Sequence, residues 1–189
     1  FAGGSNSGRH AVYVGAGSSH CIVSDNVVDK FQSSGIVVYA LETQAPCKSN
    51  LIDGNMITDC GGNLNTDSGG VEVAGNVRDN MVCCNIIDGF KMMGISVNDV
   101  GQGLNANQCT VIHGNEVLRS GQHGIQLKNC ACPSVKNNLV RDSSQSGPQV
   151  GRGIVLQSTV GAMLLGNRSS GESQRDDYQI NQTVPLPTG

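Results

Sequence analysis

The stretch His113–Asn129, "HGNEVLRSGQHGIQLKN", contains two short apolar segments separated by a polar run with two glycines. Asn115 stands just before the first segment, and Gly124 stands just before the second. Short segments that alternate apolar and polar residues and favour β-branched side chains are typical of β-strands. The order asparagine, strand, polar corner, glycine, strand recurs along the chain, and this recurrence decides the fold.

Three motifs recur in a fixed order. An asparagine followed by an apolar pair occurs at intervals of 29, 30, 30, 23 and 29 residues, with a degraded last copy: Asn26, Asn55, Asn85, Asn115, Asn138 and Asn167. A glycine precedes an apolar-x-apolar strand in five places, and "HAVYV" at 10–14 is an earlier member: Gly35, Gly70, Gly94, Gly124 and Gly153. The third motif precedes each asparagine, as in "LIDGN" and "VIHGN". A period of this length indicates a repeat architecture with three short strands per repeat.

The predicted fold is all-β, a parallel β-helix of about six coils, each made of three short strands. Alternation within each strand assigns the inward residues, and stacking of the coils places like upon like in one aliphatic column. Before the asparagine the inward residues are Val23, Ile52, Val82, Ile112, Val135 and Leu164; after it they are Val28, Ile57, Ile87, Val117 and Val140. In the glycine strands they are the pairs 12/14, 36/38, 71/73, 95/97, 125/127 and 154/156.

The repeated asparagine marks a bend that is too tight for an ordinary loop. We expect the asparagine itself to adopt the left-handed backbone region, which asparagine and glycine tolerate best. Stacked asparagine side chains can also hydrogen-bond along the ladder. The alternative is a row of ligand-binding asparagines. The other two corners vary in length, and long corner loops often build a binding face.

Composition limits the classes of function. The net charge of -3 and a pI near 5.7 give no reason to expect a nucleic-acid partner. No run of 18 apolar residues is present, so we expect no membrane span. The chain begins at Phe1, which suggests a processed chain or a piece of a longer protein. We expect a β-helix domain over 1–175, followed by a last strand and an extended tail over 176–189.

Eight cysteines would suggest disulfides in a smaller secreted domain. Several of them adjoin strand patterns, and a buried cysteine behaves as a small hydrophobic residue. Cys83-Cys84 and the pair Cys130 and Cys132 resemble metal-ligand pairs, although neither has C-x-x-C spacing. We favour reduced, packed cysteines with at most one or two loop disulfides, and expect no metal and no cofactor.

The motifs "LIDGNMI" and "GISV" at this spacing resemble the right-handed parallel β-helix superfamily, which includes pectate-lyase-like enzymes, glycoside hydrolases, alginate epimerases and phage tailspikes. The resemblance runs from about residue 10 to 181 and implies a right-handed, single-stranded helix. It also implies an extended polysaccharide as partner, because a stacked sheet offers an elongated groove. Neither a calcium-binding aspartate cluster nor an epimerase signature is present.

Phage tailspikes are the most similar members, and this likeness implies a homotrimer and an extracellular or virion location. One outward stripe after the asparagines is apolar, which suggests a partner surface such as a trimer axis, or a covering segment; single exposed aliphatic residues are the alternative. The stripe consists of Val27, Met56, Ile86 and Leu139.

The resemblance places the glycan groove on the sheet of glycine strands, whose outward side chains are polar in the middle. Glycoside hydrolysis needs two carboxylates about 5–10 Å apart. Candidate catalytic residues are Glu72, Asp67 and Asp99, with Asp59 as another partner for Glu72. Candidate substrate-binding residues are Tyr39, Asn98, His123, Gln126, Lys128 and Arg152. The alternative is that Glu72 is merely solvated.

Two functions remain open from the sequence. The first is a tailspike-like depolymerase that hydrolyses or eliminates a polysaccharide. The second is a non-catalytic glycan-binding or structural shaft module of a phage tail or cell-surface protein. A second site around Asp29 and Asp88, which share an outward column after the asparagines, is a further alternative, whereas His113 and Lys136 are expected to be solvated.

Overall fold

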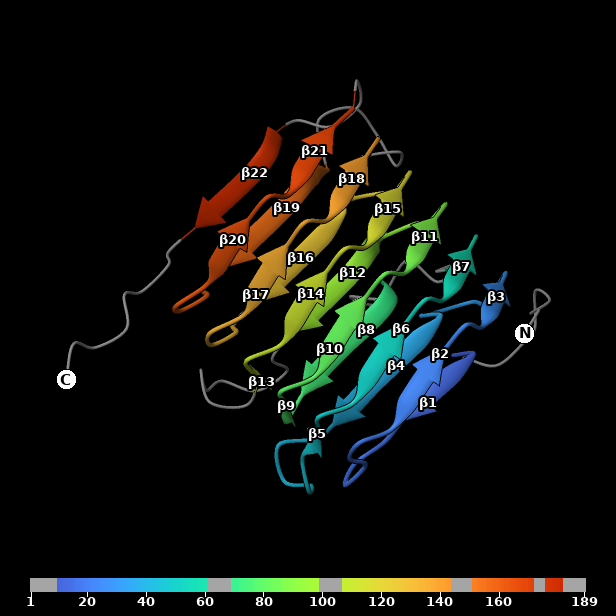
Figure 1. Cartoon of the computed structure of the whole chain (residues 1–189), viewed down its shortest axis with the longest axis vertical. Coiled ribbons are helices and arrows are strands. Elements are labelled where there is room, and N and C mark those ends of the chain that lie inside the picture. The colour runs from blue at the N-terminus through green and yellow to red at the C-terminus, as the bar shows by residue number, and fades with distance from the viewer. Residues whose placement is uncertain (1–9, 61–68, 99–106, 144–150, 172–175, 182–189) are drawn as a thin grey trace.

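The computed structural model describes residues 10–60, 69–98, 107–143, 151–171 and 176–181. Every strand in this part of the chain pairs in parallel with the equivalent strand of the next repeat, and the strands form three long sheets and one short one. Figure 1 shows the strands stacked as successive coils, with two sheets forming the nearer layer and the third lying behind it.

The strands are short and recur in the same order. The first sheet contains β1 (Val12–Val14), β4 (Ile36–Ala40), β8 (Gly69–Gly75), β12 (Met93–Asn98), β16 (Ile125–Lys128), β19 (Arg152–Gln157) and β22 (Asp176–Asn181). The second contains β2 (Ile22–Ser24), β6 (Leu51–Asp53), β10 (Met81–Cys83), β14 (Val111–His113), β17 (Ser134–Lys136) and β20 (Met163–Leu165). The third contains β3 (Val27–Asp29), β7 (Met56–Thr58), β11 (Ile86–Asp88), β15 (Glu116–Leu118), β18 (Leu139–Arg141) and β21 (Arg168–Ser170).

A fourth, three-stranded sheet was not predicted from the sequence. It lies at the corner between the first and second sheets and contains β5 (Cys47–Lys48), β9 (Val77–Arg78) and β13 (Asn107–Gln108). These strands are two residues long, which is too short for an alternating pattern to reveal them. The three strands predicted for each coil are otherwise present.

The core is the predicted aliphatic column. The inward residues of the three sheets are buried, with Val12, Val23 and Leu164 only partly covered near the ends of the stack. The strand register places like positions opposite one another, for example Ile57, Ile87 and Val117 on consecutive coils. Phe90 is the largest side chain in this core, so the column is filled almost entirely by valine, isoleucine and leucine.

The repeated asparagines form a continuous hydrogen-bonded ladder, as predicted. Each side-chain nitrogen donates to the side-chain oxygen of the asparagine one coil further on, at 2.9–3.0 Å, through Asn26, Asn55, Asn85, Asn115, Asn138 and Asn167. The same oxygens accept from the backbone N–H of the preceding asparagine. The ladder therefore satisfies buried backbone donors at the bend.

The prediction that the asparagine itself adopts the left-handed backbone region at this bend was wrong. Positive φ values fall on the residue before each asparagine, at Asp25, Gly54, Cys84, Gly114, Asn137 and Gly166, and not on the asparagines. The residue before each asparagine takes the left-handed backbone conformation that turns the chain. The asparagine that follows it places its side-chain amide in the hydrogen-bonded ladder. A second, shorter ladder at the preceding corner, Asn50 to Asn80, was not predicted.

All eight cysteines are free. Cys47, Cys60, Cys83 and Cys130 are buried, in agreement with the packed interpretation, whereas Cys84 and Cys109 are exposed. Buried Cys47 and Cys130 donate to backbone carbonyls, and Cys60 both donates to Thr58 and accepts from the Phe31 amide. As small, weakly polar groups, these thiols form hydrogen bonds with backbone groups at the corners of the core.

The outer face of the nearer layer carries exposed apolar side chains. The predicted stripe is present, with Val27 59%, Met56 46% and Ile86 42% exposed and Leu139 half-buried. A parallel stripe on the second sheet was missed and contains Ile22, Met81 and Met163. The described residues include no helix able to span a bilayer.

Candidate functional site

The candidate site lies on the outward face of the first sheet. Strand register defines two outward columns that cross the coils. The first column runs through Val37, Glu72, Ser96, Gln126 and Val155. The second runs through Tyr39, Ala74, Asn98, Lys128 and Gln157. Most of the sequence-predicted site residues therefore share one face, on strands spaced at the usual inter-strand distance of about 4.8 Å.

A third set of side chains stands where the chain enters this sheet, directly before the motif glycines. These entry positions are Ser34, Gly69, Met93, His123 and Arg152. Backbone bonds tie them coil to coil: Gly94 donates to the His123 carbonyl and Gly124 to the Arg152 carbonyl. Side chains at the entry positions can therefore reach the first column, and Ser34 does so.

Glu72 is half-buried, and its carboxylate is oriented by a residue that the sequence analysis missed. The Ser34 hydroxyl donates a hydrogen bond of 2.5 Å to Glu72 Oε2. Ser34 is fully buried, and both neighbours of Glu72 in its column, Val37 and Ser96, are buried as well. Low exposure and a charge-assisted hydrogen bond hold the carboxylate in one place. The sequence signal for Ser34 was its position before Gly35, equivalent to that of His123 before Gly124.

Ser96 lies between Glu72 and Gln126 in the same column. Its exposed fraction is 0%, and its hydroxyl has no hydrogen-bond partner among the described residues. An unpaired buried hydroxyl costs about 1–3 kcal/mol. The hydroxyl adjoins Glu72 and is a candidate donor to a bound molecule.

His123 stands beside Arg152 at the entry positions. The backbone N–H of Arg152 donates to His123 Nδ1 at 3.2 Å. The pKa of His123 falls from 6.5 to about 4, first because of burial and second because of the positive charge of Arg152. The imidazole is therefore neutral at pH 7. Because Nδ1 accepts a hydrogen bond, the proton is assigned to Nε2, and the ring offers a donor to a ligand.

This lowered pKa predicts acid sensitivity. Unfolded His123 takes up a proton as the pH falls through 6.5, but folded His123 does so only near 4. The unfolded state thus binds more protons in this window, and stability contributed by the neutral ring is lost as the pH falls from 6.5 to 4. We expect His123→Gln to give a shallower loss of unfolding free energy than the wild type over this range, measured by urea denaturation.

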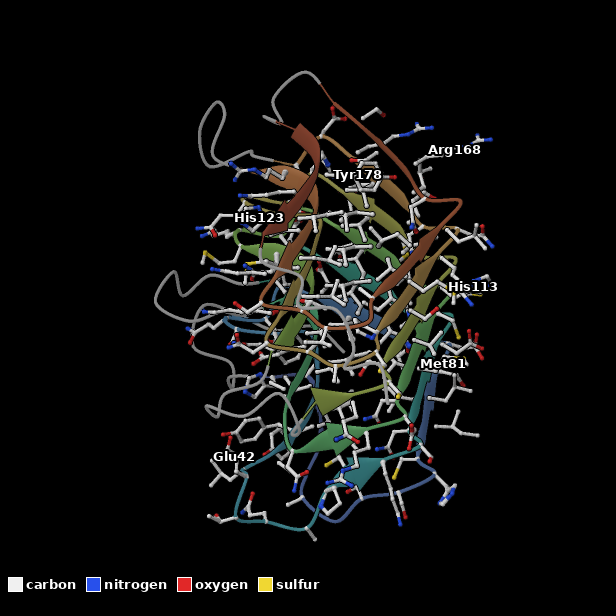
Figure 2. All side chains as sticks on the ribbon, turned by 90° about the vertical axis from the view of Figure 1, so that its left-hand side faces the viewer. Glu42, Met81, His113, His123, Arg168 and Tyr178 are labelled. Atoms are coloured by element: carbon white, nitrogen blue, oxygen red, sulfur yellow. The ribbon has the colours of Figure 1, made fainter. Side chains whose placement is uncertain are left out.

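His113→Gln is the matched control, because His113 lies on the second sheet. Figure 2 shows His113 and Met81 on the side of the solenoid opposite His123. The control should keep the wild-type pH profile. Parallel profiles for His123→Gln and the wild type would contradict a pKa shift at His123.

The structure brings some predicted residues together and leaves others undescribed. Asn98 and Lys128 are direct neighbours, whereas Tyr39 stands two coils from Asn98 with Ala74 between them. His123 and Arg152 are joined by the bond described above. Asp67 and Asp99, two of the proposed partners of Glu72, lie outside the described residues, and the third, Asp59, is exposed directly after β7 of the third sheet.

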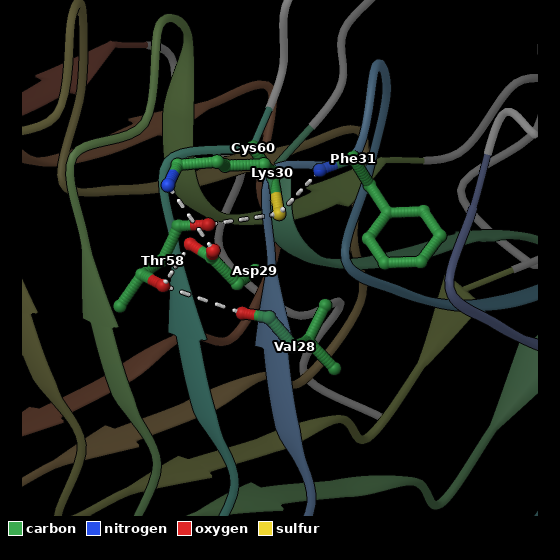
Figure 3. Close-up of polar contacts among 6 residues, drawn as sticks. All are labelled: Val28, Asp29, Lys30, Phe31, Thr58 and Cys60. Carbon is green, nitrogen blue, oxygen red and sulfur yellow. Dashed lines mark hydrogen bonds and ion pairs between the residues drawn. The ribbon is translucent and has the colours of Figure 1, made fainter. Parts of the chain in front are cut away.

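The alternative acidic column on the third sheet has partners of its own. Thr58 lies between Asp29 and Asp88 in the strand register. Its hydroxyl donates a hydrogen bond of 2.8 Å to Asp29 Oδ1, and Lys30 forms an ion pair with Asp29 at 3.5 Å (Figure 3). Asp88 accepts two hydrogen bonds from the Arg119 guanidinium, at 2.7 and 2.6 Å. These contacts give both carboxylates a structural role in linking coils.

No protein-family model matches the chain, and no curated protein sequence matches it. Among solved structures, it is similar to the enzymatically active domain of tailspike protein 2 of bacteriophage CBA120, with 12% identity and a TM-score of 0.68 over 91% of this chain and 25% of that one. Full-length tailspike protein 2, from the bacteriophage of Escherichia coli, gives 12% identity and 0.70 over 94% and 23%.

A mutant of the periplasmic alginate epimerase AlgG is also similar, with 19% identity and a TM-score of 0.56 over 94% of this chain and 43% of that one. The chain thus spans about a quarter of the tailspike chains and under half of the epimerase. Likeness at this identity concerns the fold, and it agrees with the parallel sheets and the stacked coils. The chain is a right-handed parallel β-helix, the fold of the tailspike and the epimerase.

Proposed function

We propose that the outward face of the first sheet binds an acidic polysaccharide and cleaves it at Glu72. The observation that carries this proposal is the Glu72 carboxylate, half-buried and oriented by Ser34, on a face that also presents Lys128 and Arg152. The columns repeat at a fixed spacing, which suits an extended chain of sugars. Two cations on this face of a chain with net charge -3 favour a negatively charged glycan.

The proposed roles follow from the chemistry of each side chain. Hydrolysis would use Glu72 with a second carboxylate, for which Asp67 and Asp99 remain the candidates. Elimination would use Lys128 or Arg152 to neutralise the charge that develops on a sugar carboxylate. Neutral His123, together with Tyr39, Asn98 and Gln126, would donate to or accept from sugar oxygens.

The second candidate is a non-catalytic glycan-binding or shaft module of a phage tail or cell-surface protein. It is favoured by the scarcity of carboxylates: Glu72 is the only acidic residue in the first six strands of this sheet, β1, β4, β8, β12, β16 and β19, and the last strand, β22, adds Asp176 and Asp177. In this case Glu72 would be a structural acceptor for Ser34, and the polar columns would bind a glycan without cleaving it.

The exposed apolar stripes support a homotrimer, and the tailspike-like fold supports an extracellular or virion location. In the first stripe the exposed residues Val27, Met56 and Ile86 occupy the same outward position on successive coils. In the second stripe half-buried residues separate the exposed ones, which are Ile22, Met81 and Met163. A row of aliphatic side chains at a fixed repeat would pack against the same row of another copy.

The test is Glu72→Gln, assayed for cleavage and for binding of a panel of acidic polysaccharides. The expected result is a loss of at least about tenfold in cleavage with binding retained, because the amide keeps the shape and the Ser34 bond but cannot transfer a proton. The matched control is Asp29→Asn, a carboxylate that likewise accepts from a hydroxyl of the next coil. It should cleave like the wild type.

Each outcome separates the two candidates. Unchanged cleavage by Glu72→Gln would remove Glu72 from the mechanism. A wild type that binds but never cleaves would favour the non-catalytic module, and a wild type that neither binds nor cleaves would contradict both.

A further inference from the structure

A cluster of metal-ligating side chains lies on the second sheet, where β6 and β10 end at the asparagine bend. Asp53, Cys83 and Cys84 each direct one ligand atom into it, and these atoms lie within 4.8 Å of one another. Cys83 Sγ donates to Asp53 Oδ1 at 3.2 Å across the two coils. The sequence pointed to the Cys83-Cys84 pair, but Asp53 is 30 residues away and joins it only through the strand register.

The cluster combines a buried thiol with an accessible one. Cys83 is 7% exposed, whereas Cys84 is exposed and Asp53 half-buried, so an ion from solvent could reach the site. Gly114 on the next coil leaves room beside Cys84, because a Cβ there would lie 3.8 Å from Cys84 Sγ. Ser24 and His113 flank Asp53 and Cys83 in the same outward column.

Burial, followed by the hydrogen bond and charge of Asp53 and then by Cys84, raises the pKa of the Cys83 thiol to about 12. Thiolates are the species that bind metals, so binding of a cation requires the loss of the thiol protons.

We propose that Asp53, Cys83 and Cys84 bind a thiophilic divalent cation of the Zn²⁺ type, with solvent in the fourth position. Zinc takes thiolate and carboxylate ligands at about 2.3 and 2.0–2.2 Å in a tetrahedron, so two ligand atoms around one ion lie about 3.6–3.8 Å apart. The ligand atoms of the cluster lie within 4.8 Å of one another, so they would draw together by at most about 1 Å around the ion. Binding exchanges two thiol protons for one ion and joins two coils.

This site is separate from the proposed glycan face. The paired residue of Cys83, His113, lies on the side of the solenoid opposite His123 (Figure 2). The cation would therefore stabilise the stack of coils and take no part in glycan cleavage. The proposal does not depend on the function assigned to the first sheet.

The test is titration of the purified, reduced protein with Co²⁺, a spectroscopic substitute for Zn²⁺. The expected result is one equivalent bound with a sulfur-to-cobalt charge-transfer band, displaced by Zn²⁺, together with a higher melting temperature in Zn²⁺. Cys84→Ser should abolish the band and the thermal shift, and Asp53→Asn should weaken binding at least tenfold. Cys84 is exposed, so its substitution leaves the core intact.

The matched control removes another pair of neighbouring thiols. Cys109 and Cys132 follow the parallel bridge between Gln108 and Ala131 and lie on adjacent coils. The double variant Cys109→Ser, Cys132→Ser should keep the wild-type band. Absence of the band in the wild type, its survival in Cys84→Ser, its loss in the control pair, or unchanged affinity in Asp53→Asn would each overturn the proposal.

Discussion

Replacing Asn85 with alanine is expected to destabilise the protein by at least about 3 kcal/mol, since several buried polar groups lose their partners at once. Asn85 Oδ1 accepts from the amide and the side chain of Asn55, both at 2.9 Å. Its Nδ2 donates to the Ile52 and Cys83 carbonyls and to Asn115 Oδ1. Asn85 is 0% exposed, so water cannot replace these bonds. Urea denaturation measures the loss.

The control for this substitution is Asn137→Gly. Asn137 is an exposed asparagine at the same bend, with φ 53°, and it lies next to Asn138 of the ladder. Glycine accepts this conformation, so the change should stay within about 1 kcal/mol of the wild type. Equal effects at Asn85 and Asn137 would show that the ladder is not the source of stability.

Gly94→Ala is expected to cost about 3 kcal/mol for a different reason, the close approach of neighbouring coils. A Cβ at Gly94 would clash with the Val117 side chain and would lie 2.8 Å from the carbonyl oxygen of Gly124. That oxygen belongs to the backbone of the next coil and accepts the Ile95 amide, so it cannot move freely. Thermal and urea denaturation should both report the loss.

Gly114→Asn separates this steric effect from backbone conformation. Gly114 has φ +65°, and the one atom near its missing Cβ is Cys84 Sγ at 3.8 Å. Asparagine already occupies the equivalent position of the next coil, as Asn137. We expect a change below about 1 kcal/mol. A cost at Gly114 as large as that at Gly94 would contradict the assignment of Gly94 to coil contact.

The fold was accessible from sequence because each coil repeats the same local rules. Ile57, Ile87 and Val117 could be assigned inward from alternation alone, and the structure buries them all. The role of each residue at the bend was harder to predict, because asparagine is equally suited to a left-handed turn and to a hydrogen-bonded ladder. The structure gives the turn to the preceding residue, such as Gly54, and the ladder to Asn55.

The candidate site was only partly predictable. Alternation placed Glu72, Gln126 and Lys128 on one face, but it could not show that the Ser34 hydroxyl reaches Glu72 from the preceding coil. Such contacts depend on side-chain length and corner geometry, which a repeat pattern does not encode. The same holds for Asp53 and Cys83, whose contact spans 30 residues of sequence.

The most direct test of the account is binding of acidic polysaccharides by the wild type and by the double variant Lys128→Ala, Arg152→Ala. The control removes two cations from the other sheets, Lys136 on β17 and Arg141 on β18. We predict that the wild type and the control bind the same acidic glycan, more weakly at high salt, and that the Lys128/Arg152 variant binds at least tenfold more weakly. Equal binding by both double variants, or no binding of any acidic glycan by the wild type, would contradict the account.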